Sequence, residues 1–137
     1  MKFFLRFFLV LALVNSFSYG LDFKQTRTIK LKKDEQKKIL VKYDNFIKLF
    51  EFRWTLYKNG GLVIHRSYDK IISQNILYKR YKNNTFRLEL KLPGAGKYYN
   101  LPYILVKFEE FDFTTNEAVL KLFLYDDLGK VSLKDIK

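Results

Sequence analysis

The sequence contains no cysteine, one histidine, two prolines and six glycines among its 137 residues. The absence of cysteine excludes disulfide bonds, thiol catalysis and cysteine-ligated metal sites, so burial of side chains must stabilise any folded state. The single histidine, His65, provides neither an ordinary set of zinc ligands nor the base of a recognisable Ser-His-Asp triad. We therefore interpret His65 as a polar residue on a strand face. We expect no enzymatic activity, no metal and no other cofactor.

Other catalytic patterns are missing as well. The adjacent carboxylates Glu109-Glu110 would point to opposite faces of a strand, whereas glycosidase chemistry needs two carboxylates that face each other. Asp126-Asp127 is typical of a turn. Pro93-Gly-Ala-Gly-Lys97 lacks the glycine spacing and the Ser or Thr of a phosphate-binding loop. These residues predict turns and strand faces, not an active site.

Long apolar runs are absent except at the N-terminus. A basic start (MKFFLR) precedes the apolar run Phe7–Val14, and the polar, small-residue segment Asn15–Gly20 follows it. These are the three parts of a secretory signal peptide, and the apolar run is much shorter than the roughly 20 residues of a membrane-spanning helix. We expect cleavage before Leu21, with a cut after Ser18 as the alternative. The sequence thus predicts a signal peptide at residues 1–20, export across the inner membrane to the periplasm, and no transmembrane span after cleavage.

The remaining residues, 21–137, are expected to form one β-rich domain. Hydrophobic residues make up 48% of the chain and aromatic residues 18%, which is enough apolar surface to build a core. The length suits one ordinary domain and is too small for two good cores.

The charge balance is strongly basic, with a formal net charge of +12. Such a balance favours an anionic partner, but the codon usage of an AT-rich genome produces the same excess of lysine without any binding function. Lysine outnumbers arginine by 20 to 6. Because arginine is the residue suited to bidentate phosphate recognition, we do not expect nucleic acid as a partner.

Alternation of apolar and polar residues dominates the chain after the signal peptide and predicts strands. The expected strands cover residues 26–33, 38–43, 46–57, 62–67, 76–82, 86–92, 103–113, 117–125 and 130–133. Residues 68–74 are ambiguous and are compatible with a short helical turn.

Turn residues predict how these strands are paired. The clearest hairpin joins 46–57 to 62–67 through Asn59-Gly60-Gly61. Polar turns also predict a hairpin of 26–33 with 38–43 and another of 76–82 with 86–92. This pattern favours an antiparallel, immunoglobulin-like β-sandwich of about seven or eight strands, with a small β-barrel as the alternative.

Two surfaces are candidates for binding. Lys30, Lys32, Lys38 and Lys42 share the parity that would place them on the solvent face of the predicted N-terminal hairpin. They would form a site for an anionic lipid or glycan of the envelope, or they are edge lysines that block aggregation. The second surface comprises Tyr98, Tyr99 and Tyr103, next to the Pro-Gly segment. Exposed aromatics can anchor a partner, but such residues also build cores, as we expect for Trp54.

One stretch resembles proteins of a known kind. Residues 52–62 (FRWTLYKNGGL), followed by Tyr68-Asp69 and Ile76-Leu77-Tyr78, are similar to small uncharacterised exported proteins of Gram-negative bacteria. The resemblance implies a periplasmic location and no particular activity. Together these observations predict a non-enzymatic interaction or structural module with another envelope protein as partner, for example an accessory of a flagellar motor or secretion apparatus. The alternative is binding of an anionic lipid or glycan through the N-terminal lysines.

Overall fold

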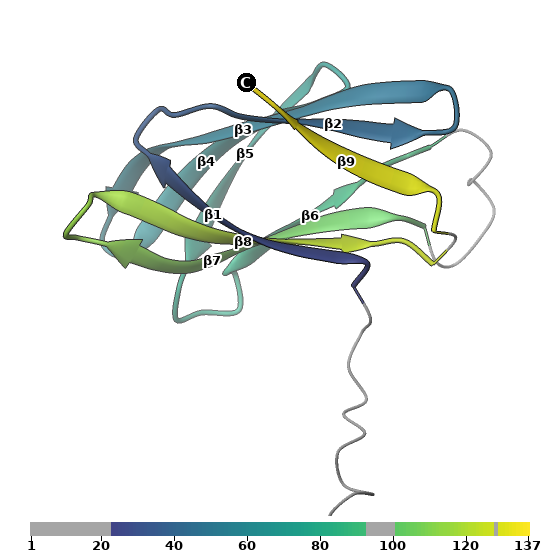
Figure 1. Cartoon of the computed structure of the whole chain (residues 1–137). Helices are drawn as coiled ribbons and strands as arrows, with labels where there is room; N and C mark the ends of the chain where they lie inside the picture. Colours follow the sequence, from purple (N-terminus) through teal and green to yellow (C-terminus); the bar gives the residue numbers. More distant parts are fainter. Residues whose placement is uncertain (1–22, 93–100, 128) are drawn as a thin grey trace, which may run out of the picture.

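Two antiparallel β-sheets packed face to face make up the protein (Figure 1). The computed structural model describes residues 23–92, 101–127 and 129–137. Its strands are β1 (Gln25–Lys32), β2 (Lys37–Tyr43), β3 (Phe46–Lys58), β4 (Gly61–Tyr68), β5 (Ile71–Tyr78), β6 (Thr85–Glu89), β7 (Tyr103–Asp112), β8 (Glu117–Tyr125) and β9 (Val131–Ile136). A four-stranded sheet has the order β1-β8-β7-β6, and a five-stranded sheet has the order β5-β4-β3-β2-β9.

This architecture confirms the predicted antiparallel β-sandwich, and the sheets do not close into the alternative barrel. The described residues contain nine strands, as many as the expected strand ranges and slightly more than the seven or eight expected of the sandwich. Each sheet is a run of consecutive hairpins, β2 to β5 or β6 to β8, to which one terminal strand is added. The strand order therefore differs from that of an antibody constant domain, whose sheets mix strands from both halves of the chain.

The core lies between the two sheets because each strand turns alternate side chains inward. Ile39 and Val41 of β2 are buried from one side, and Leu120 and Leu122 of β8 from the other. The core also holds large rings such as Phe50. Full burial of such a side chain contributes about 1.5–3 kcal/mol, which is how a chain without disulfides is stabilised.

The predicted hairpin around Asn59-Gly60-Gly61 is confirmed as β3 and β4. Asn59 and Gly60 both have positive φ, 53° and 77°, as the tight turn requires. A β-bulge between Trp54 and Leu56 shifts the register. Leu56, which alternates in sequence with the buried Phe52 and Trp54, is exposed as a result, and Tyr57 packs against the core in its place.

The predicted N-terminal hairpin is wrong. β1 pairs with β8 in the four-stranded sheet, whereas β2 pairs with β3 and β9 in the five-stranded sheet (Figure 1). The chain crosses between the sheets at Asp34, whose N–H donates to the carbonyl of Trp54 at 2.9 Å. The Trp54 indole N–H donates in turn to the carbonyl of Leu31 at 2.8 Å. The apolar faces of β1 and β2 consequently meet across the core and do not lie side by side.

The predicted hairpin of 76–82 with 86–92 is also wrong, because β5 pairs with β4 and β6 pairs with β7. The ambiguous residues 68–74 belong to β4, a turn and β5, with no helical turn. The segment after β5 crosses to the other sheet, where the N–H of Tyr78 donates to the carbonyl of Asn83 at 3.0 Å. The Asn84 carbonyl then accepts from the N–H of Phe108 at 2.8 Å.

The sandwich has two open sides, which differ in how they are closed. β1 and β9 flank one side, where Arg27 of β1 bonds the Asp135 carboxylate at 2.6 Å and the Leu133 carbonyl at 3.1 Å. Lys24 adds an ion pair of 3.3 Å to Asp126. β5 and β6 flank the other side, which contains the candidate site.

No helix in the described part of the chain is long and apolar enough to cross a membrane. The predicted signal peptide at residues 1–20 lies outside the described residues.

Candidate functional site

The four lysines predicted to share one face lie on two different faces. Lys30 and Lys32 alternate with buried residues of β1 and project from the outer face of the four-stranded sheet. Lys38 and Lys42 alternate with buried residues of β2 and project from the outer face of the five-stranded sheet. The expectation of a single basic surface is therefore wrong, because it depended on a hairpin that does not form.

The predicted aromatic surface is only partly within the described residues, since Tyr98 and Tyr99 lie outside them. Tyr103 lies on β7 and is 9% exposed. Its ring stacks on that of Tyr125 at 4.9 Å between centroids, and the guanidinium of Arg87 covers it at 3.7 Å. Tyr103 therefore offers little ring surface to a partner.

The neighbours of His65 and Asp126 indicate structural roles and not catalytic ones. His65 is half-buried on β4 and lies in register between Arg53 and Gln74, with no carboxylate beside it on either strand. Asp126 is buried, and its carboxylate accepts a bond of 2.7 Å from the N–H of Val131. Across the described residues, no three His, Cys, Asp or Glu side chains are grouped so that they could hold a metal ion.

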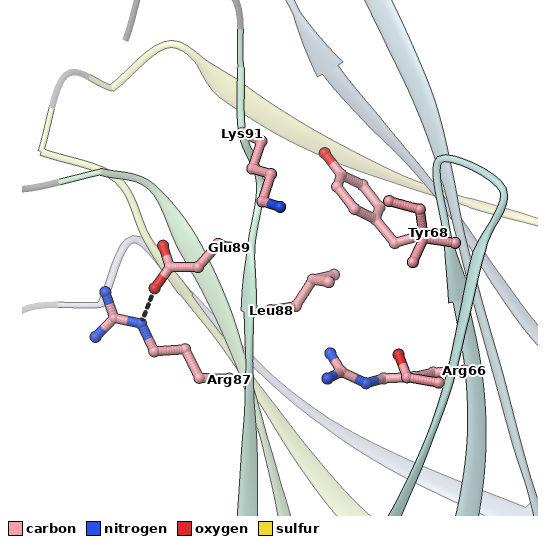
Figure 2. A pocket seen from close by; sticks show the side chains of 8 residues that line it. Arg66, Tyr68, Arg87, Leu88, Glu89 and Lys91 are labelled. Carbon is pink, nitrogen blue, oxygen red and sulfur yellow. Dashed lines mark hydrogen bonds and ion pairs between the residues drawn. The ribbon is translucent and has the colours of Figure 1, made fainter. Parts of the chain in front are cut away.

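A slot of about 190 Å³ opens between the sheets on the β5–β6 side (Figure 2). Its lining comes from β4, β5, β6 and the residues just after β6: Arg66, Tyr68, Ile71, Ser73, Arg87, Leu88, Glu89 and Lys91. Figure 2 shows Arg66, Tyr68 and Leu88 pointing into this space. The slot is thus a gap in the core where the two sheets separate.

The inner faces of β4 and β5 are polar at this gap. Arg66 and Ser73 are paired in register and face inward, in line with the buried Ile64 and Leu77. Nε of Arg66 and Oδ1 of Asn75 are both buried without a hydrogen-bond partner among the described residues. The Arg66 guanidinium lies over the Phe86 ring at 4.6 Å, and burial lowers the pKa of Arg66. An unpaired buried polar atom is costly, so its retention calls for an explanation.

The slot is electropositive. Lys91 also lines it and has a positive φ of 46°. Glu89 accepts a bond of 2.6 Å from Arg87, and Figure 2 shows both of these side chains on the side of β6 away from Arg66. No ion pair to Arg66 or Lys91 is present in the described structure. Of the three cationic residues that line the slot, Arg66 and Lys91 therefore have no carboxylate partner within the described structure.

The edge of β5 is unusual for this chain. The strand (IISQNILY) has no charged residue, although 29% of the residues in the sequence are charged. Ile71 is 63% exposed and Ile72 is 79% exposed. Exposed, uncharged edge strands attract other strands, and proteins usually block them with charges.

The other three edges do carry such charges. β1 has Lys30 and Lys32, β9 has Lys134 and Asp135, and the five-residue β6 has an arginine and a glutamate. Around β5, charged residues stand only at the ends, as Asp69-Lys70 before the strand and Lys79-Arg80 after it. β5 is thus the one edge within the described structure that lacks this protection.

An aromatic groove of about 380 Å³ lies at the Tyr78 end of β5. It is lined by Tyr57, Asn59, Gly60, Tyr78, Lys79, Arg80, Tyr81, Phe111 and Phe113. The rings of Tyr57 and Phe111 stack at 4.3 Å with an angle of 5° between their planes. Tyr81 and Phe113 are each 72% exposed. The two most exposed aromatic side chains of the described residues therefore lie here, with two cations beside them.

Sequence reasoning did not identify this groove or the slot. Tyr81 falls within the expected strand 76–82. Its position next to the polar residues Asn83-Asn84 was the one indication in the sequence that its ring is exposed. Arg66 was placed in an expected strand without a special role, and nothing in the sequence marks it as inward-facing. Comparison with known proteins adds no assignment, because no family model, curated protein or solved structure matches the chain.

Proposed function

We propose that this protein is a non-enzymatic, periplasmic interaction module that binds another envelope protein by adding an extended segment of it to the edge of β5. The observation that carries the proposal is the uncharged β5 edge with its exposed isoleucines, next to three edges that bear charges. Strand addition to an exposed edge is a recurrent mode of peptide recognition, in which backbone hydrogen bonds supply affinity.

The backbone of β5 is arranged for this pairing. The Tyr78 N–H points away from β4, because it donates to the carbonyl of Asn83. Alternate residues of a strand direct their backbone groups to the same edge. The N–H and C=O groups of Ile72, Gln74 and Ile76 therefore face the open edge, where an added strand would find its hydrogen-bonding partners.

Charge favours a different protein over a second copy of this chain. A full-length antiparallel pair of β5 strands would bring Lys70 of one copy close to Lys79 and Arg80 of the other, while the neighbouring Asp69 carboxylate is already paired with Lys48 at 3.2 Å. Like charges directly opposite each other destabilise a strand pair. A segment with acidic residues at its ends would instead pair with these cations.

The aromatic groove extends the same surface. Tyr78 both ends β5 and lines the groove, so a segment that continues beyond β5 reaches the exposed rings of Tyr81 and Phe113. Such rings are frequent anchors of protein partners. A module of this kind suits an accessory of a large envelope assembly, such as a flagellar motor or secretion apparatus.

A proline substitution at the edge of β5 tests the proposal. Gln74→Pro removes an N–H that faces the open edge, so the fold tolerates it, whereas Gln74→Ala keeps the N–H and is the matched control. A photo-crosslinker at Ile72 in the native envelope should capture the same protein in wild type and Gln74→Ala, and lose it in Gln74→Pro. Capture that persists in a folded Gln74→Pro variant would refute strand addition. Circular dichroism of both variants checks the fold.

A further inference from the structure

Arg66 is a half-buried cation whose Nε has no hydrogen-bond partner in the described structure. It lies on β4, one strand in from the open edge, and faces the slot with its Nε buried and unpaired. A guanidinium has five N–H donors and stays charged at neutral pH even when burial lowers its pKa. Its contact with the Phe86 ring satisfies part of that charge and none of the in-plane donors.

The register of β5 shows which position of an added strand would face Arg66. Arg66 is paired with Ser73, and both side chains lie on the inner face. An added strand would place one residue opposite Ser73 in a non-hydrogen-bonded pair, where Cα atoms are about 4.5 Å apart. That residue also points inward, about 10 Å from the Cα of Arg66 in all. The small Ser73 side chain leaves the path between them open.

The charges around the slot select the chemistry of that residue. Arg66 and Lys91 both line the slot. The carboxylates nearest to it are engaged elsewhere: Glu89 with Arg87 at 2.6 Å, and Asp69 with Lys48 at 3.2 Å. A carboxylate matches the geometry of a guanidinium and forms two parallel hydrogen bonds with it.

We propose that the segment added to β5 carries an aspartate or glutamate that enters the slot opposite Ser73 and pairs with Arg66. This inference rests on the proposed strand addition and specifies its partner: an extended segment with one inward-facing carboxylate. The alternating positions on either side of that residue face the outer surface, next to Ile72 and Gln74. Arg66 is thus the residue that sets the sequence preference, while the β5 backbone supplies affinity for any strand.

A displayed library of random nine-residue peptides, selected on the purified protein, provides the probe. We expect an acidic residue to be enriched at one fixed position among peptides whose binding is lost in Gln74→Pro. A synthetic peptide from this set should bind Arg66→Gln roughly tenfold or more weakly, because a charged hydrogen-bonded pair is lost. Arg53→Gln removes the same charge from an exposed position of β3 that does not line the slot, and should leave the affinity unchanged.

Two further results separate the possible failures. Selection on Arg66→Glu should replace the acidic residue with lysine or arginine at the same position, a readout that a folding defect cannot mimic. Peptides that need the β5 edge but show no acidic preference, or that bind Arg66→Gln as well as wild type, would overturn the pairing with Arg66 and leave strand addition intact. A library that yields no peptide sensitive to Gln74→Pro would overturn both.

Discussion

The hydroxyl of Tyr68 donates a hydrogen bond of 2.6 Å to the backbone carbonyl of Leu90. Tyr68 ends β4 and Leu90 directly follows β6, so this bond joins the two sheets beside the slot. Burial of the hydroxyl, with a smaller effect of the Asp69 carboxylate, raises the pKa of Tyr68 above its usual value of 10.0. This contact between the sheets therefore depends on the protonation of one side chain.

Replacement of this tyrosine should have a pH-dependent effect. Tyr68→Phe should lower the free energy of unfolding by about 1 kcal/mol at neutral pH, because the hydrogen bond is lost. Since the folded-state pKa is raised, the contribution of Tyr68 is fully present below pH 10 and is lost as the pH rises towards the folded-state pKa. Denaturant unfolding of both proteins should therefore show a constant difference below pH 10 and a smaller one above it. The exposed Tyr81→Phe is the control, and a difference that stays constant at alkaline pH would contradict this account.

Asp126 should be the more sensitive member of the Asp126-Asp127 pair. Its buried carboxylate accepts from the N–H of Val131 at 2.7 Å and pairs with Lys24 at 3.3 Å, so it fastens β9 at its first residue. Asp126→Ala leaves a buried N–H unpaired and should cost about 1–3 kcal/mol of stability. The exposed Asp127→Ala should stay within about 0.5 kcal/mol of wild type. Thermal or denaturant unfolding measures the stability of both variants. Equal losses of stability in the two variants would contradict this prediction.

Gly61 should resist substitution because of one ring. A Cβ added at Gly61 would lie 2.8 Å from Cε1 of Tyr78, which is too close for an undisturbed contact. Gly61→Ala should therefore displace the Tyr78 ring and lower stability by about 1–3 kcal/mol. The same change in a Tyr78→Ala background should cost clearly less, which a double-mutant cycle of unfolding free energies measures. An equal cost in both backgrounds would show that the ring is not the obstacle.

The separation of the four lysines has a measurable consequence for the anionic-ligand alternative. Lys30 and Lys32 lie on one outer face of the sandwich and Lys38 and Lys42 on the other. A flat anionic vesicle cannot contact both pairs at once. Reversing the charge of one pair should therefore weaken retention on anionic vesicles only slightly, because the other face can still bind, whereas reversing both pairs should abolish retention. A salt-dependent sedimentation assay in which reversing a single pair already abolishes retention would point to one shared surface.

The sequence was most informative where local chemistry decides the structure. Asn and Gly tolerate positive φ, so the turn at Asn59-Gly60 and the β3–β4 hairpin could be predicted. Both residues do have positive φ in the structure. The polar turn at Asp34 also has a positive φ, of 64°, but it leads from one sheet to the other. Alternation alone does not distinguish these cases, because a strand has the same apolar face whether its partner lies beside it or across the core.

The candidate site was hidden for a related reason. Ser73 and Asn75 occupy inward positions of β5 at which a half-buried strand normally has apolar residues. Without this alternation, residues 68–74 showed no clear period. Tyr103 shows the opposite case. It was expected on an exposed binding surface, but Tyr125 and Arg87 cover its ring from neighbouring strands. Long-range packing of this kind leaves no local signal.

The pairing of the terminal strands also fixes the order in which the protein can form. β1 can pair only once β8 has been synthesised, and β2 gains its second neighbouring strand only when β9 is present. Each sheet therefore joins residues from opposite ends of the chain. Contacts of such long sequence separation make folding slow, because the entropy of loop closure must be overcome first. A chain that emerges from its N-terminus therefore cannot complete either sheet until its last segments are available. Through most of its synthesis, β1 therefore has no partner strand and β2 has only one.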